Sequence, residues 1–154
     1  MCIRDSFSPG YYASVGYSVP TALGLAFADP TRRVLALSGD AAFQMTGVEV
    51  STMGRFGLNP IVVVMNNGGY GTERPLYDAP FDDVARWRYA ELPAVMGAGK
   101  GFVAGTEEEF AAALEAARDF TGGFVIIDAH IEAGDISPAF RRFLELFGVG
   151  AKPE

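Results

Sequence analysis

"RVLALSGDAAFQ", residues 33–44, and "IVVVMNNGGYGTE", residues 61–73, are the stretches that decide the fold of this chain. Each is an apolar run that stops abruptly at small and oxygen-bearing residues, Asp40 in the first and Asn66-Asn67 in the second. Short, continuously apolar runs are typical of strands in a parallel sheet with both faces covered. The two stretches therefore predict two buried strands with polar side chains at their carboxyl ends.

Helical patterns alternate with strand patterns along the rest of the sequence. We expect helices at residues 17–30, 42–57, 89–98, 106–120 and 137–148, further strands at 101–105 and 122–131, and an irregular segment at 68–83. Thr106 and Glu109 predict a capping box, and Ser137 predicts an N-cap before Pro138. This alternation predicts an α/β fold, a three-layer sandwich around a mostly parallel sheet.

Composition narrows the class of protein. The formal net charge of −7 and the lack of a basic stripe argue against partners such as nucleic acid or an anionic membrane. No apolar run reaches the length of a membrane span, and one cysteine cannot form an internal disulfide, so we expect a cytoplasmic protein. "MCIRDS" at the start resembles translated adapter read-through. We therefore expect residues 1–10 to be a non-native leader and residues 11–150 to be one domain.

The carboxyl ends of the first two strands carry the candidate chemistry, because ligands bind there in parallel sheets. Asp40 and Asn67 offer hard oxygens that suit Mg²⁺ or Ca²⁺, and neighbouring strands would bring them about 5 Å apart. N–H groups at Ala41-Ala42 could receive a phosphate, and Gly69 and Gly71 allow a close backbone approach. The residues predict a Mg²⁺–diphosphate site, although each half taken alone is also an ordinary turn.

The spacing of these residues resembles a known motif. Gly39-Asp40, then 26 residues, then Asn67 preceded by Asn66, is similar to the thiamine diphosphate motif. The run "NNGGYGTERPLYDAPFDDVARWRYAEL", residues 66–92, resembles the pyruvate and indolepyruvate decarboxylase branch of that family. The resemblance extends from about Tyr11 to near Gly148, and alanine replaces a common glycine at positions 41 and 13.

The resemblance implies a cofactor site in the thiamine diphosphate-binding fold, here truncated at its N-terminus. Asp40, the Asn67 side-chain oxygen and the Gly69 carbonyl would be the ligands of Mg²⁺. Val15 would be the apolar wedge that bends the cofactor, and the Ala13 carbonyl would accept a hydrogen bond from its aminopyrimidine. The implied cofactor-binding residues are Ala13, Val15, Gly39, Asp40, Ala41, Ala42, Asn67, Gly69, Tyr70 and Gly71.

Glu73 is implied as the catalytic glutamate, because it follows Asn67 by six positions, as in this decarboxylase branch. There it assists protonation and product release beside the leaving carboxylate. The alternative is a solvated Glu73-Arg74 surface pair. Thr72 matches a substrate-pocket position. For other polar or aromatic residues, we expect a structural or solvated His130, packing roles for Trp87 and Tyr89, and a solvated Arg141-Arg142 pair.

The function implied is non-oxidative decarboxylation of a 2-keto acid such as indolepyruvate, pyruvate or phenylpyruvate, which gives an aldehyde and carbon dioxide. The alternatives are a carboligase of the acetohydroxyacid synthase type, against which Glu73 speaks, and a non-catalytic Mg²⁺–phosphate-binding module. The family's N-terminal and middle domains have no counterpart here. We therefore expect an inactive fragment of a carboxy-lyase that is a homodimer or homotetramer when complete.

Overall fold

A computed structural model describes residues 6–146 and 148 of the chain. Its four described strands, β1 (Leu35–Gly39), β2 (Ile61–Asn66), β3 (Lys100–Ala104) and β4 (Val125–His130), form one sheet in the order β1-β2-β4-β3. Every pair in this sheet is parallel, and Gly39 lies opposite Met65. Residues 1–5 of the expected leader, and residues 147, 149 and 150 of the expected domain, lie outside the described residues.

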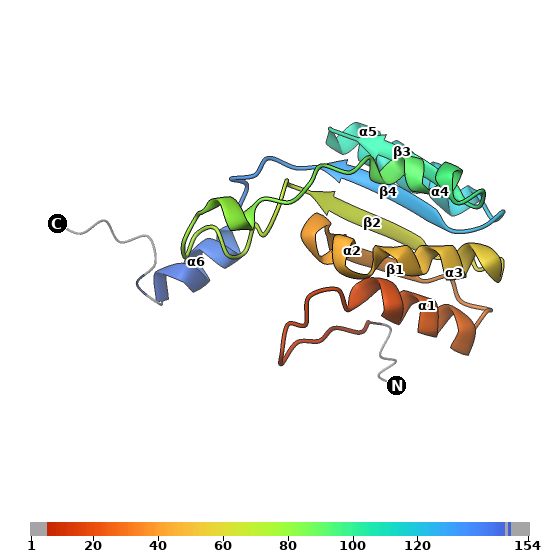
Figure 1. The fold of residues 1–154 in the computed structure, drawn as a ribbon, viewed down its shortest axis with the longest axis horizontal. Helices are drawn as coiled ribbons and strands as arrows, with labels where there is room; N and C mark the ends of the chain where they lie inside the picture. Colours follow the sequence, from red (N-terminus) through yellow and green to blue (C-terminus); the bar gives the residue numbers. More distant parts are fainter. Residues whose placement is uncertain (1–5, 147, 149–154) are drawn as a thin grey trace.

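Helices cover both faces of the sheet (Figure 1). The helices of one layer are α1 (Ser18–Ala28), α2 (Asp40–Thr46), α3 (Val50–Arg55) and α4 (Leu92–Val95). The other layer is α5 (Glu107–Asp119), and α6 (Pro138–Leu146) lies beside the irregular segment, beyond the carboxyl ends of β2 and β4. This arrangement confirms the α/β fold and its three layers.

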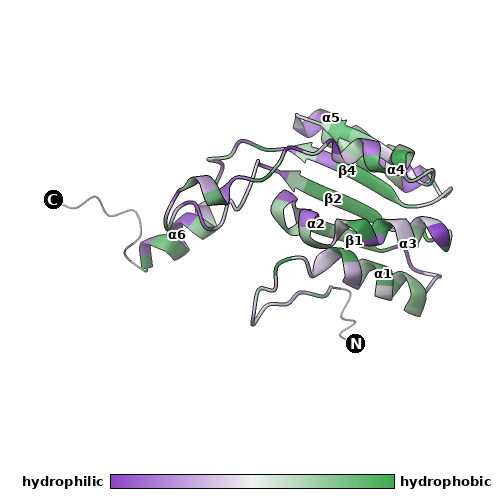
Figure 2. Cartoon of the chain, viewed as in Figure 1, coloured by the Kyte–Doolittle hydropathy of each residue, from purple (hydrophilic) through white to green (hydrophobic). Residues whose placement is uncertain are grey.

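The two apolar cores are separated by the sheet, and β2 contributes to both. Val62 and Val64 pack with Phe43 and Met53 on the α1–α4 side, whereas Ile61, Val63 and the α5 alanines pack on the other side. Figure 2 shows β2 and β4 as predominantly hydrophobic ribbons between these layers. Burial on both faces explains why these strands are continuously apolar.

Strand β1 corrects the prediction of a buried strand. Ala36 and Ser38 are buried against the α1–α4 layer, but Leu35 and Leu37 are 56% and 59% exposed on the opposite face. The cause is that α5 packs on β3 and β4, so no described element covers β1 on this side. One face of β1 is therefore open and apolar.

The helix expected at 42–57 is also interrupted. It begins two residues earlier, at Asp40, and a 3₁₀ turn, η1 (Gly47–Glu49), separates α2 from α3. The Phe43 ring lies so close to Gly47 that a Cβ there would be 2.3 Å from it. Thr46, with φ of −138°, leaves helical geometry at this point. Gly57 closes the segment with φ of +63°, as a C-terminal glycine should.

The predicted helix caps are present, with one difference. The Thr106 hydroxyl accepts a hydrogen bond from the Glu109 N–H at 3.2 Å, and the Ser137 hydroxyl accepts one from the Phe140 N–H at 3.1 Å. The Glu109 carboxylate, however, accepts from the Gly105 N–H at 2.7 Å and thus reaches one residue further back than a capping box predicts.

Arg33 joins the start of β1 to the end of α5. Its guanidinium donates to the carbonyls of Asn59, Ala117, Arg118 and Phe120 at 2.7–2.8 Å. Three of these carbonyls belong to the end of α5, where backbone acceptors lack helical partners. This contact holds α5 against the sheet at the amino ends of its strands, away from the carboxyl ends. Among the described helices, none is long and apolar enough to cross a membrane.

Candidate functional site

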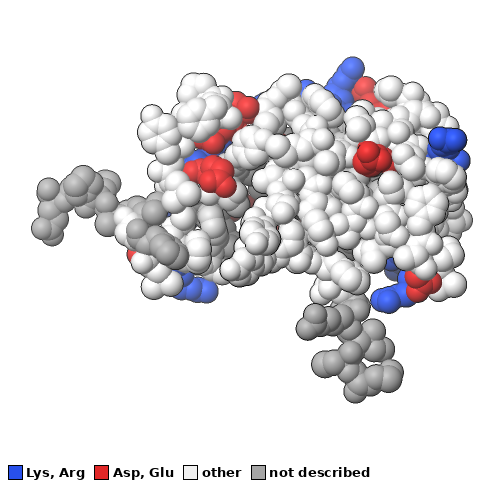
Figure 3. Space-filling view, turned by 60° about the horizontal axis from the view of Figure 1, so that its bottom comes forward, with Lys and Arg blue, Asp and Glu red and all other residues white. Residues whose placement is uncertain are grey.

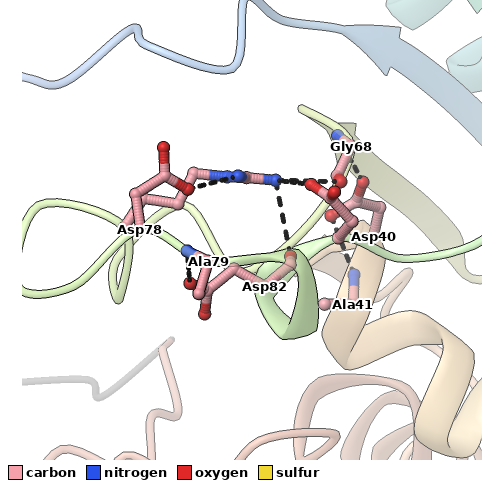
Figure 4. Close-up of polar contacts among 8 residues, drawn as sticks. Asp40, Ala41, Gly68, Asp78, Ala79 and Asp82 are labelled. Carbon is pink, nitrogen blue, oxygen red and sulfur yellow. Dashed lines mark hydrogen bonds and ion pairs between the residues drawn. The ribbon is translucent and has the colours of Figure 1, made fainter.

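Asp40 and Asn67 meet because β1 and β2 are neighbours in the sheet. Asp40 is the first residue of α2, directly after β1, and Asn67 follows the last residue of β2. Asp40 is only 1% exposed, and its carboxylate accepts hydrogen bonds from the N–H groups of Ala41 at 2.8 Å and Gly68 at 2.7 Å (Figure 4). Burial raises the pKa of Asp40 above its ordinary value, and the N–H donors oppose that rise.

Three side-chain and backbone groups converge at this point. One terminal atom of the Asn67 amide lies 3.2 Å from Asp40 Oδ1 and 2.8 Å from the Gly69 carbonyl oxygen. Hydrogen bonding favours nitrogen in that position, where the amide donates two hydrogen bonds. With the amide turned so that oxygen takes this place, that oxygen would lie about as far from each of the two acceptors as neighbouring ligands of an octahedral Mg²⁺ lie from each other, roughly 2.9 Å when metal–oxygen distances are 2.0–2.1 Å.

The donor set suits a small, hard cation. It consists of one carboxylate, one amide and one backbone carbonyl, which are the oxygen ligands that Mg²⁺ prefers. Among the residues that the structure describes, no three His, Cys, Asp or Glu side chains form a cluster that could hold a metal ion, so a cation here would rely on amide and carbonyl oxygens as well as Asp40. The Gly69 carbonyl is placed by a backbone with φ of +153°, where a Cβ would collide with the Asp82 carbonyl oxygen at 1.9 Å. Position 69 therefore needs glycine.

A groove of about 1170 Å³ lies over this cluster. The floor of the groove is the open face of β1. Figure 3 shows one side of the molecule, on which charged side chains are few. All the residues that the sequence nominated line this one groove except Asp40, which is buried beneath them. The lining residues among them are Ala13, Val15, Gly39, Ala41, Ala42, Asn67, Gly69, Tyr70, Gly71, Thr72 and Glu73.

The loop before α1 is held in a strained shape. Ala13 has φ of +47°, the only positive value for a described residue other than glycine, and this left-handed conformation favours glycine. Gly16 has φ of +83°, and its carbonyl accepts a hydrogen bond from the Thr46 hydroxyl at 2.7 Å. Val15 is half exposed toward the groove. Ala41, by contrast, has no positive φ, so alanine at that position costs no backbone strain.

Several backbone N–H groups of the expected cofactor-binding residues already have hydrogen-bond partners. The N–H of Ala41 donates to Asp40, the N–H of Tyr70 to the Asp82 carbonyl, and the N–H of Gly71 to the Gly69 carbonyl. A diphosphate that used these three donors would have to share or replace those bonds. The Asn67 amide and the Gly69 carbonyl are also hydrogen-bonded, so a cation would replace the two hydrogen bonds that the amide donates to Asp40 and Gly69.

Glu73 lies at the margin of the groove with Thr72, and both side chains are exposed. The described residues do not enclose Glu73 in an apolar cleft. Arg74 does not pair with it either, because its guanidinium contacts Asp78 at 2.8 Å and Asp83 at 2.6 Å. The alternative prediction, a surface pair of Glu73 with Arg74, is therefore wrong, because Arg74 pairs with Asp78 and Asp83 instead.

Asp128 is a buried polar residue that the sequence did not bring into the candidate site. Its carboxylate lies within β4, accepts a hydrogen bond from the Asn66 amide at 2.9 Å and is 3.5 Å from His130 Nε2. Asn66 in turn accepts a hydrogen bond from the Ile131 N–H at 2.9 Å. Asp128 thus supports the residue next to Asn67, whereas His130 is half exposed. The signal in the sequence was an acidic residue inside an otherwise apolar strand.

Tyr89 is a packing residue, as expected, and it packs in the apolar core between the sheet and the α1–α4 layer. It is fully buried, and its ring meets Phe43 edge to face with 5.4 Å between the centroids. Gln44 Nε2 donates to the Tyr89 hydroxyl at 2.8 Å and to the Ala85 carbonyl at 2.5 Å, which links α2 to the segment after the groove. Trp87 is more exposed and lies 6.1 Å from the Tyr89 ring.

Fold and site together define a parallel α/β domain with its ligand groove at the carboxyl ends of neighbouring strands. The family described as "Thiamine pyrophosphate enzyme, C-terminal TPP binding domain" matches residues 2–129. The chain therefore belongs to the thiamine pyrophosphate enzymes and corresponds to their C-terminal TPP-binding domain. The match includes residues 2–10, and the expectation of a non-native leader there stays a prediction.

Curated relatives are decarboxylases by name. Indole-3-pyruvate decarboxylase of Azospirillum brasilense is 38% identical over 139 residues, 90% of this chain and 25% of that protein. An alpha-keto-acid decarboxylase of Mycobacterium ulcerans is 35% identical over 147 residues, 93% of this chain and 25% of that protein. The chain thus spans about a quarter of the length of these relatives.

A solved structure shares the fold. The thiamine diphosphate-dependent 4-hydroxybenzoylformate decarboxylase of Rhodococcus jostii RHA1 superposes with a TM-score of 0.68 over 79% of this chain and 24% of that one. The sequence identity is 23%, so this likeness concerns the arrangement of strands and helices.

Proposed function

We propose that this chain is the diphosphate-binding part of a thiamine diphosphate- and Mg²⁺-dependent 2-keto acid decarboxylase, which converts an aryl or alkyl keto acid into an aldehyde and carbon dioxide. The names of the two curated relatives support this class of substrate. The observation that carries the proposal is the convergence of the Asp40 carboxylate, the Asn67 amide and the Gly69 carbonyl under a groove, with one terminal amide atom 3.2 and 2.8 Å from the two oxygens.

In this proposal, the three converging oxygens hold Mg²⁺, and Mg²⁺ in turn binds the diphosphate. Bound thiamine diphosphate supplies a nucleophilic carbon and an electron sink for decarboxylation. The loop that contains Ala13 and Val15 faces the same groove, and its Thr46–Gly16 hydrogen bond fixes it to α2. The chain contributes position and electrostatics to the reaction.

Glu73 is proposed to transfer a proton near the substrate carboxylate. A carboxyl performs such a transfer best when water is excluded from around it. Because Glu73 is exposed in this chain, the enclosure has to come from another part of the complete enzyme. Thr72, next to it, is proposed to limit the size of the keto acid.

The rest of the enzyme is also part of the proposal. N-terminal and middle domains would complete the groove in a cytoplasmic homodimer or homotetramer. The open apolar face of β1, with Leu35 and Leu37, supports a cover of this kind. We expect the 154-residue chain alone to show no decarboxylation.

The test uses the complete protein of which this chain is a part. After removal of metal with EDTA, Mg²⁺ and thiamine diphosphate should restore release of an aldehyde from indolepyruvate, phenylpyruvate or pyruvate. Asp40→Asn should abolish cofactor binding, whereas Asp119→Asn, at an exposed carboxylate at the end of α5, should not. A condensed hydroxyketo acid as product would indicate a carboligase instead. Binding of Mg²⁺–ATP without thiamine diphosphate would indicate a phosphate-binding module.

A further inference from the structure

Arg74 is a largely buried cation next to the groove. The proposed reaction does not explain the contacts that its side chain makes. Its side chain is 18% exposed, and its Nε has no hydrogen-bond partner. The guanidinium contacts four oxygens, from the carboxylates of Asp78 and Asp83 at 2.8 and 2.6 Å and the carbonyls of Gly68 and Asp82 at 3.3 and 3.4 Å. Gly68, Asp78 and Asp82 are labelled in Figure 4.

These oxygens belong to two chain segments that fold back on each other. Gly69 and Asp83 form an antiparallel bridge, the Tyr70 N–H donates to the Asp82 carbonyl at 2.9 Å, and the Val84 N–H donates to the Gly68 carbonyl at 3.3 Å. Arg74 contacts both segments, at Gly68 on one and at Asp82 and Asp83 on the other. It therefore closes the loop of residues 68–83 from inside.

The closed loop adjoins the converging oxygens directly. Gly68 donates its N–H to Asp40 at 2.7 Å and offers its carbonyl to Arg74 at 3.3 Å. At the following residue, Gly69, a Cβ would lie only 2.8 Å from Arg74 Nη2. One guanidinium nitrogen thus lies against the backbone whose carbonyl faces Asn67.

We propose that Arg74 is a positioning residue, which holds the Gly69 carbonyl in place for the cation by clamping the loop of residues 68–83. The inference rests on the proposed function, because it assumes that this carbonyl binds Mg²⁺. Arg74 touches neither substrate nor cofactor in this role. It acts through the backbone of Gly68 and Gly69.

The chemistry of arginine fits this role better than that of lysine. A planar guanidinium can contact several oxygens in fixed directions, whereas an ammonium is a compact point charge. The carboxylates of Asp78 and Asp83 are about two-thirds exposed, so the two ion pairs themselves add little stability. The specific contribution of Arg74 is the geometry that it imposes on the two carbonyls.

The experiment compares Arg74→Met and Arg74→Lys with Arg33→Met in the complete protein. Arg33 is a matched control, because it also binds backbone carbonyls but borders the groove at the opposite end of β1, away from Asp40, Asn67 and Gly69. Hydrogen exchange of the metal-free protein and the Mg²⁺ concentration for half-maximal binding of thiamine diphosphate are measured for each variant.

We expect Arg74→Met to speed amide exchange in residues 68–84 and to raise the half-saturating Mg²⁺ concentration at least tenfold, as loss of supporting contacts around a metal site usually does. Arg74→Lys should recover part of the affinity. Arg33→Met should lower the melting temperature and leave the Mg²⁺ requirement within about twofold of wild type.

Wild-type Mg²⁺ affinity in Arg74→Met would overturn the inference, as would an equal loss in Arg33→Met, since that would indicate a general stability effect. If Arg74→Met does not fold, the Lys variant decides by the same two measurements. Failure of the wild-type protein to bind Mg²⁺ and thiamine diphosphate would instead refute the proposed function.

Discussion

Gly71→Ala tests the assignment of Asn67 as a cation ligand with a single methyl group. A Cβ on Gly71 would lie 2.2 Å from Asn67 Nδ2, and Gly71 has no positive φ that would strain an alanine. Because non-bonded heavy atoms need about 3.5 Å, the amide must move by roughly 1 Å. Metal–oxygen distances for Mg²⁺ are held near 2.0–2.1 Å, so a shift of this size removes the ligand.

The expected result is a weaker Mg²⁺ site in a stable protein. Perturbing a group that orients the first coordination shell typically costs tenfold to a hundredfold in metal affinity, or about 1.4–2.8 kcal/mol. The free energy of unfolding should change by less than about 1 kcal/mol, because the atom in the way is the end of a movable side chain. Calorimetric titration of the complete protein with Mg²⁺ and thiamine diphosphate measures the first quantity, and denaturant unfolding measures the second.

Gly24→Ala is the control for adding a methyl group. Nothing lies within 4 Å of a Cβ at this exposed position in α1, so Mg²⁺ affinity should be unchanged and stability should rise by about 0.5–1 kcal/mol. If Gly71→Ala binds Mg²⁺ as tightly as Gly24→Ala, Asn67 is not a ligand. If both lose affinity, the geometry derived for position 71 is wrong.

Three further variants test the surroundings of the site. Ala13→Gly should raise the free energy of unfolding by roughly 0.5–1 kcal/mol in denaturant melts, because it relieves the left-handed φ of +47°; a destabilised variant would contradict this. Asp128→Ala should cost about 1–3 kcal/mol by leaving the Asn66 amide unpaired, whereas Asp128→Asn, which keeps an acceptor, should cost less; equal melting temperatures would refute the support role. Gly101→Ala should destabilise by roughly 3 kcal/mol without a specific effect on Mg²⁺, because its Cβ would lie 1.8 Å from the Ala90 carbonyl oxygen; wild-type stability would refute it.

The strands and the polar residues at their carboxyl ends were predictable because local sequence patterns mark them. Continuous apolar runs ended by Asp40 and Asn66-Asn67 mark both the strands and their carboxyl ends, and parallel pairing of β1 with β2 then brings the oxygens together. The Ser137 and Thr106 caps were readable for the same reason, since each depends on a partner three residues away.

Other features depend on tertiary contacts that no short pattern encodes. The break between α2 and α3 arises where the Phe43 ring occupies the space beside Gly47. The partners of Arg74 lie four to nine residues away in an irregular segment, where no periodicity indicates which acid it meets. Leu35 and Leu37 were expected to be buried because they are apolar, but apolarity does not reveal whether another element covers them.

The charge of the donor set explains how cation and diphosphate would depend on each other. Asp40 is the only carboxylate among the three groups that converge, so a bound Mg²⁺ would keep a net charge of about +1 there, in a buried place where such charge is costly. A diphosphate supplies both the missing anionic charge and further oxygens for the octahedron. Each would therefore strengthen the binding of the other by the same factor, since coupling between two ligands is reciprocal. In the proposed site, the neutral amide and carbonyl would favour a metal–diphosphate pair, whereas a second carboxylate would favour Mg²⁺ without diphosphate.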